Sequence, residues 1–121
     1  MESVEAWKPF EDIENNQWQE AEKFNMPKGG LVIGHLLPDV PEEIIHAAGA
    51  FPIAIEGASS PISLSAAHIP AYTCSHVMGT LDLGLSGKLD KMDALVIPYV
   101  CDSTRNLSHL WKQLFPGKPS E

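Results

Sequence analysis

Residues 72–115 read YTCSHVMGTLDLGLSGKLDKMDALVIPYVCDSTRNLSHLWKQLF, and they decide the fold class of the chain. This stretch holds both cysteines of the sequence, Cys74 and Cys101. Apolar residues at helical spacing follow Cys74, and Gly87 ends that expected helix. The apolar run at residues 93–100 then predicts a strand, and Cys101 opens a last amphipathic helix. An apolar strand between two helices is typical of βα units.

The same alternation of elements extends upstream. Continuous apolar runs at residues 31–37 and 51–55 predict two buried strands. Residues 42–48 predict a helix between them, because Pro41 and the two glutamates after it suit a first helical turn. Residues 56–71 are rich in Gly, Ser and Pro and predict a long loop with one short helical turn. We therefore expect an α/β fold of three layers, with a mostly parallel sheet made of Rossmann-like β-α-β units.

The two ends of the chain differ from this central region. Residues 1–28 predict an N-terminal helical segment, and residues 117–121 predict a linker or tail after the α/β domain at residues 29–116. An apolar face of the N-terminal segment is expected to pack on that domain. This face consists of Phe10, Ile13, Trp18, Ala21 and Phe24.

Charge and hydropathy argue against several classes of protein. The 121 residues carry a formal net charge of −8, so no basic patch is expected that could bind nucleic acid. No apolar run approaches the length of a membrane span, and the acidic N-terminus lacks the features of a signal peptide. We therefore expect a cytoplasmic protein with neither nucleic-acid nor membrane partners. In that compartment, cysteines are more often thiols or metal ligands than members of a disulfide.

Each cysteine is expected at the start of a helix. The helix dipole and the free N–H groups there stabilise a thiolate, and they would also stabilise the negative charge of a thiolate-bound metal cluster. Cys101 also directly follows an expected strand, so it belongs at the edge of the sheet where ligands gather in open parallel sheets. The stretch is therefore interpreted as half of a metal-cluster site, because two thiolates alone do not hold an iron–sulfur cluster.

The spacing of the cysteines leaves other interpretations open. Without a CxxC pair, both cysteines could be small buried residues of the core. A zinc site could use Cys74, His76, Cys101 and His109, and a cysteine paired with a histidine could be a nucleophile. Arg105, in the last expected helix, either orients an anion near the site or lies on a solvated surface.

Three segments of the chain form a specific combination. They are residues 40–53 (VPEEIIHAAGAFPI), Tyr72-Thr73-Cys74 with residues 81–87 (LDLGLSG), and residues 98–108 (PYVCDSTRNLS) with Leu110 and Trp111. On these segments, which span about residues 30–115, the chain resembles the iron–sulfur subunits of the 2-hydroxyacyl-CoA dehydratase and ATP-dependent benzoyl-CoA reductase family.

The resemblance implies a longer subunit that pairs with a related sister subunit as a heterodimer and holds a 4Fe–4S cluster through three cysteines. Cys74 and Cys101 match the first two of these ligands, so they are the expected cofactor-binding and metal-binding residues. The resemblance further implies an ATP-dependent activator, whose low-potential electrons pass through the cluster to an acyl-CoA substrate. It identifies no catalytic residue in this chain.

The chain departs from the family pattern because it has no third cysteine. We therefore expect it to be the N-terminal portion of a family subunit and to be inactive alone. Residues 85–90 (LSGKLD) and 105–112 (RNLSHLWK) slightly favour ring reduction of the benzoyl-CoA reductase type. The alternatives are a subunit of a 2-hydroxyacyl-CoA dehydratase, which is a lyase, and a non-catalytic scaffold domain that has lost the cluster.

Overall fold

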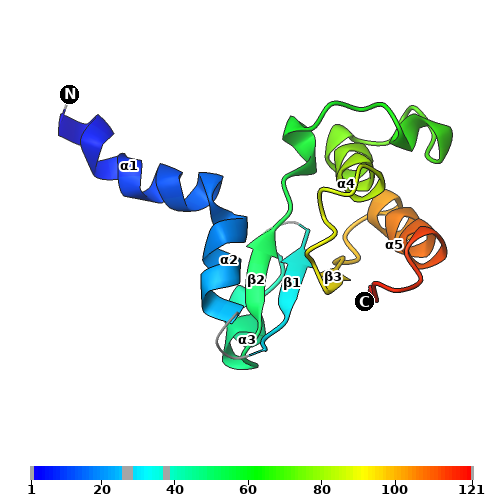
Figure 1. Cartoon of the computed structure of the whole chain (residues 1–121). Coiled ribbons are helices and arrows are strands. Elements are labelled where there is room, and N and C mark those ends of the chain that lie inside the picture. The colour runs from blue at the N-terminus through cyan, green and yellow to red at the C-terminus, as the bar shows by residue number, and fades with distance from the viewer. Residues whose placement is uncertain (1, 26–28, 37–38, 121) are drawn as a thin grey trace.

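The fold is a parallel sheet between helices, seen in a computed structural model that describes residues 2–25, 29–36 and 39–120 (Figure 1). The strands are β1 (Val32–His35), β2 (Phe51–Ala54) and β3 (Ala94–Val96). They pair in the order β2-β1-β3, and every pairing is parallel. Helix α3 (Glu42–Ala47) and helix α4 (Ser75–Leu85) lie on opposite faces of the sheet in Figure 1. The expected three-layer α/β fold with parallel strands is confirmed.

The third strand is shorter than its apolar run predicts. The expectation covered residues 93–100, whereas β3 ends at Val96. Pro98 has no N–H to donate to a neighbouring strand, and its carbonyl oxygen accepts a hydrogen bond from the Val100 N–H at 3.0 Å. This turn ends the strand just before Cys101.

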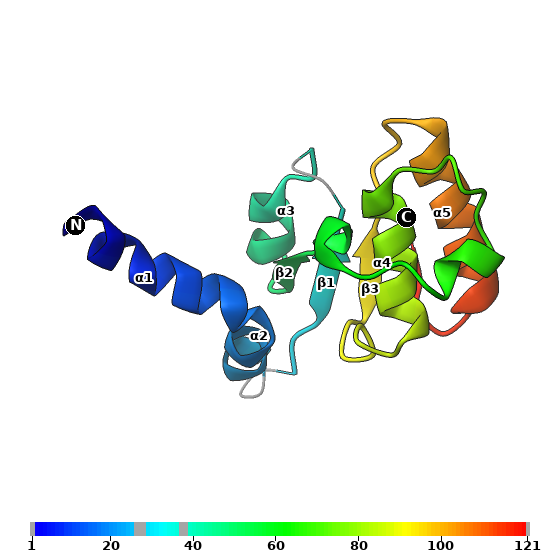
Figure 2. The ribbon, with the colours of Figure 1, turned by 90° about the horizontal axis from the view of Figure 1, so that it is seen from above.

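The N-terminal segment forms two helices, α1 (Glu2–Asn15) and α2 (Gln17–Asn25). Ala21 is buried, and Trp18 packs against the core from α2. The predicted packing of Phe10 and Ile13 is wrong, because these side chains are 64% and 58% exposed. The chain turns at Asn16, so α1 extends away from the sheet in both views (Figures 1 and 2).

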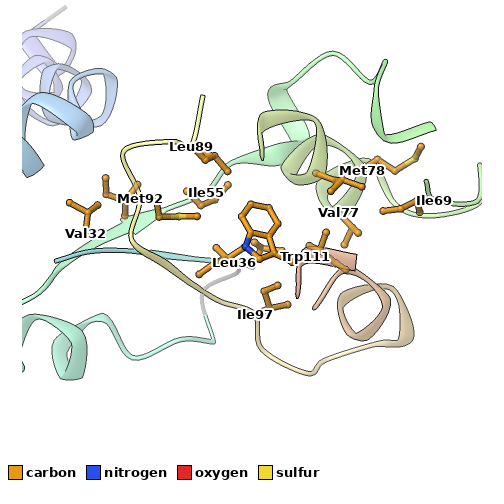
Figure 3. Close-up of a cluster of buried hydrophobic side chains, with 14 of the residues drawn as sticks. Val32, Leu36, Ile55, Ile69, Val77, Met78, Leu89, Met92, Ile97 and Trp111 are labelled. Atoms are coloured by element: carbon orange, nitrogen blue, oxygen red, sulfur yellow. The ribbon is translucent and has the colours of Figure 1, made fainter. Parts of the chain in front are cut away.

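Trp111 lies at the centre of the hydrophobic core (Figure 3). It belongs to α5 (Asp102–Leu114), and Leu107 of the same helix is also fully buried. A Cβ atom on Gly84 of α4 would lie 2.9 Å from the indole ring. The absence of a side chain at Gly84 therefore allows α4 and α5 to pack closely through Trp111.

The carboxylate of Asp82 connects the long loop at residues 56–73 to α4. It is 5% exposed and accepts hydrogen bonds from the backbone N–H groups of Ser63 (3.0 Å), Leu64 (2.8 Å) and Ser65 (3.0 Å). The hydroxyl groups of Ser63 and Ser65 donate to the same carboxylate. Burial raises the pKa of Asp82, but the hydrogen bonds from Ser65, Leu64 and Ser63 outweigh it and hold the pKa well below its usual range.

Backbone packs directly on backbone where the same loop crosses α4. The loop forms a short 3₁₀ turn, η1 (Gly57–Ser59), before a second turn, η2 (Ser65–Ala67). A Cβ atom on Gly79 of α4 would overlap the carbonyl oxygen of Gly57. Glycine is therefore required at position 79 by the close approach of η1.

Residues 117–120, which we expect to be a linker or tail, lie beside β3. The Leu95 N–H donates to the carbonyl oxygen of Pro119 at 3.1 Å, and Leu95 forms an isolated parallel bridge with Ser120. Ser120 is 2% exposed. These residues pack on the outer edge of the sheet.

Replacing Asp82 by asparagine should lower the free energy of unfolding by roughly 2–4 kcal/mol, because an amide cannot accept all of the loop's hydrogen bonds. Urea unfolding would measure the change. Asp90→Asn is the matched control, since this carboxylate is exposed and lies 3.6 Å from Lys118; it should cost less than about 0.5 kcal/mol. Equal effects of the two variants would contradict the role of Asp82.

The low pKa of Asp82 also predicts the sign of a pH effect. The folded-state pKa lies below the unfolded value of about 3.9, so the carboxylate stabilises the fold above about pH 4. This contribution is lost as the pH falls toward the folded-state pKa. The difference in unfolding free energy between wild type and Asp82→Asn should therefore shrink below about pH 4, and a difference that grows there would refute the assignment.

Replacing Gly79 by alanine should destabilise the protein by roughly 1–3 kcal/mol, because the new methyl group meets the backbone of η1. Helix propensity alone predicts the opposite sign, a gain of about 1 kcal/mol. Thermal unfolding would decide between them. Gly117→Ala is the control, since a Cβ atom there meets nothing within 4 Å and should change stability by less than about 0.5 kcal/mol.

Candidate metal-cluster site

Both cysteines lie at the starts of helices, as the sequence indicates. Cys74 is the N-cap residue of α4, and Cys101 is the N-cap residue of α5. Both are free thiols on exposed residues, so the interpretation of buried core cysteines is wrong. Figure 2 shows α4 and α5 side by side with their first turns at the same end of the molecule. The two thiols therefore belong to one end of this helix pair.

The Cys101 turn is held by a reciprocal capping arrangement with Thr104. The backbone N–H of Thr104 donates to the Cys101 sulfur, and the Thr104 hydroxyl oxygen accepts a hydrogen bond from the Cys101 N–H at 3.3 Å. The same hydroxyl donates to the Cys101 carbonyl oxygen at 2.9 Å. The Thr104 N–H lowers the pKa of the Cys101 thiol; desolvation opposes this, whereas the Thr104 hydroxyl and Ser103 reinforce it.

The Cys74 turn has a different environment. The Cys74 side chain accepts no capping hydrogen bond, although its carbonyl oxygen accepts the Met78 N–H at 3.1 Å. The loop that Asp82 anchors leads into Cys74. The position of Cys74 thus depends on the packing of the preceding loop, whereas Cys101 is held by its own helix turn.

The zinc alternative is not supported. Among the residues that the structure describes, no three His, Cys, Asp or Glu side chains come together to hold a metal ion. His109 is exposed on α5, and His76 is half-buried near the start of α4. The two thiols suit a soft, negatively charged metal centre, but further ligands would have to come from outside the described residues.

Arg105 extends from the second turn of α5 toward Tyr99. A hydrogen bond to the Tyr99 side chain and Coulombic attraction to Tyr99 and Asp102 raise the pKa of Arg105 above its usual value. The guanidinium group is fully exposed, and its partners lie on both sides of Cys101 in the sequence. Arg105 therefore contributes to the surface next to Cys101.

His35 is a buried polar residue that the sequence pattern did not single out. It is 2% exposed at the end of the central strand, and its Nε2 atom lies 3.0 Å from the Glu42 carboxylate on α3. Thr104 and Asp82 were also missed as residues that shape the site. An aspartate among the apolar residues of α4, following a serine-rich loop, was the available signal for Asp82.

Comparison with known proteins identifies the group to which the chain is related. Residues 39–120 match the model of the family described as 2-hydroxyglutaryl-CoA dehydratase, D-component. None of the helices in the described part of the chain has the length and apolar character of a membrane span.

Several characterised relatives share most of the length of this chain. A benzoyl-CoA reductase subunit from Thauera aromatica is 38% identical over 114 residues, which are 90% of this chain and 28% of that protein. The (R)-phenyllactyl-CoA dehydratase beta subunit of Clostridium sporogenes is 31% identical over 103 residues, covering 85% of this chain and 28% of that protein. The lactoyl-CoA dehydratase beta subunit of Anaerotignum propionicum is 30% identical over 118 residues, covering 96% and 32%.

The chain therefore spans about a third or less of these relatives. The family match and the relatives confirm the resemblance that the three sequence segments indicate. The chain belongs to the 2-hydroxyglutaryl-CoA dehydratase, D-component family, and its relatives are subunits of benzoyl-CoA reductase and of 2-hydroxyacyl-CoA dehydratases.

Proposed function

We propose that the chain forms the N-terminal part of an iron–sulfur subunit in an enzyme complex that acts on an acyl-CoA thioester. In this proposal Cys74 and Cys101 are two of the ligands of a 4Fe–4S cluster, and a third cysteine comes from outside the 121 residues. The observation that carries the proposal is the placement of two exposed thiols at neighbouring helix N-termini, in a chain of this family.

The described residues suit the binding of negative charge. Free N–H groups and the positive ends of the helix dipoles lie at the first turns of α4 and α5. At Cys101 the N–H of Thr104 already donates to the sulfur, as it would to a thiolate ligand. When bound, the cluster would supply low-potential electron transfer to the acyl-CoA thioester. The part played by this chain is to hold two thiolates where backbone dipoles stabilise them.

The proposed partners follow from the same assignment. They are a related sister subunit, an ATP-dependent activator that donates electrons, and the acyl-CoA substrate. The relatives are named as subunits of enzymes, which supports an assembly of more than one chain.

Reduction of an aromatic acyl-CoA is the favoured reaction. Identity to the benzoyl-CoA reductase subunit is 38%, compared with 31% and 30% for the two dehydratase subunits. Dehydration of a 2-hydroxyacyl-CoA is the second candidate, since three dehydratase subunits are also relatives. Assays of the assembled enzyme with benzoyl-CoA and with a 2-hydroxyacyl-CoA would separate the two reactions.

A non-catalytic scaffold domain is a candidate of another class. It is supported by the shortage of ligands, because the described residues bring no three metal-binding side chains together. In that case the exposed thiols would have no role in holding iron.

The 121-residue chain alone should be colourless and inactive after anaerobic reconstitution, because two thiolates do not hold a complete cluster. Iron and acid-labile sulfide analysis, with an absorption spectrum, would measure the cluster content. The expected result is much less than one cluster per chain. About four iron atoms per chain would show that the third ligand is not needed and would contradict the assignment.

Replacing Cys74 or Cys101 by serine in the complete subunit, assembled with its partner, should remove most of the cluster iron and lower activity by more than about tenfold. A hard hydroxyl oxygen replaces a soft thiolate, while the shape of the side chain is nearly kept. Ser75→Ala is the control, because this exposed side chain lies beside Cys74 and carries no proposed ligand. Unchanged iron content and activity in both cysteine variants would favour the scaffold.

A further inference from the structure

We propose that Thr104 is a positioning residue that holds the sulfur of Cys101 in the geometry required of a cluster ligand. This inference rests on the proposed function and adds to it a side chain that would not itself touch the metal. Thr104 lies in the first turn of α5, three residues after Cys101.

The hydroxyl group of Thr104 connects three backbone groups around the ligand. It accepts hydrogen bonds from the N–H groups of Val100 (3.4 Å) and Cys101 (3.3 Å), and it donates to the Cys101 carbonyl oxygen (2.9 Å). The Cys101 sulfur lies 3.8 Å from the same oxygen. Thr104 is only 1% exposed, so water cannot easily replace these bonds.

Burial also restricts how Thr104 can move. Its side chain belongs to the buried face of α5 together with Leu107 and Trp111. The core therefore holds the hydroxyl group in place, and the hydroxyl group holds the backbone of Cys101. Through this connection, the packing of α5 determines the direction in which the exposed sulfur points.

The Cys74 turn provides a natural comparison within the same chain. Val77 occupies the position in α4 that Thr104 occupies in α5, since each lies three residues after a cysteine. Val77 is buried and has no hydroxyl group, and Cys74 accepts no capping hydrogen bond. Valine at position 104 would therefore give Cys101 the residue type that is found behind Cys74.

The first experiment measures the geometry without any metal. Amide hydrogen exchange of Val100 and Cys101 is followed in the 121-residue chain for wild type, Thr104→Val and Thr104→Ser. Valine removes the acceptor of both N–H groups, so exchange at these two amides should accelerate by about tenfold or more. Serine retains the hydroxyl group and should restore exchange to within about threefold of wild type. Equal exchange in all three proteins would overturn the inference.

The second experiment measures the effect on the cluster. The midpoint potential and the electron paramagnetic resonance spectrum of the reduced cluster are compared in the complete subunit, assembled with its partner. The reduced cluster carries one more negative charge, so misaligned N–H donors should lower the potential of Thr104→Val. Thr104→Ser should return the potential toward the wild-type value.

Thr80→Val is the matched control for both experiments. Thr80 is also fully buried, and its hydroxyl donates to the His76 carbonyl oxygen at 2.8 Å in α4. This variant makes the same chemical change away from Cys101, so amide exchange at Cys101 and the cluster potential should stay at wild-type values. A shift of the potential equal to that of Thr104→Val would indicate general loosening and overturn the inference.

The outcomes for the two proposals are distinct. A complete wild-type subunit that binds no iron would refute the proposed function, and the role of Thr104 with it. A wild-type cluster whose potential and spectrum are unchanged in Thr104→Val would refute the role of Thr104 alone. Loss of iron in the valine variant with recovery in the serine variant would support the positioning role.

Discussion

The buried carboxylate of Asp82 is the interaction on which the rest of the structure depends. A charged group with 5% exposure is costly unless hydrogen bonds replace its water, and here the donors come from residues 63–65. This requirement fixes a loop that would otherwise have little to hold it, because most of its side chains are exposed. The loop leads into Cys74, so one aspartate in the middle of α4 influences the residue at the start of the same helix.

Helix α4 combines this polar anchor with two sites that tolerate no side chain. Gly79 receives the backbone of η1, and Gly84 receives the indole ring of Trp111. The helix thus contacts the loop through one glycine and α5 through the other. Because both contacts involve rigid groups, the relative placement of the loop, α4 and α5 is narrowly determined. The same placement brings the first turns of α4 and α5 to one end of the molecule.

The sequence was sufficient to predict the layers of the fold and the helix starts at both cysteines. These features depend on apolar periodicity and turn residues, which are local in the chain. The exposure of Phe10 and Ile13 could not be predicted, because the turn at Asn16 shows no strong breaker and the face remains periodic across it. The partners of Asp82 could not be predicted either, since they lie 17 to 19 residues away, and such contacts depend on tertiary structure.

The two cysteines illustrate how similar local patterns can be supported in different ways. Each is an N-cap residue, yet Cys101 is fixed within four residues by Thr104, whereas Cys74 is reached through a loop held by Asp82. A perturbation of the loop should therefore move Cys74 and leave the Cys101 turn intact. Both supports end in the same packed pair of helices, so the distance between the thiols is governed by the α4–α5 contact through Gly84 and Trp111. The core of the domain, rather than the surface around the cysteines, thus sets the geometry available to a bound cluster.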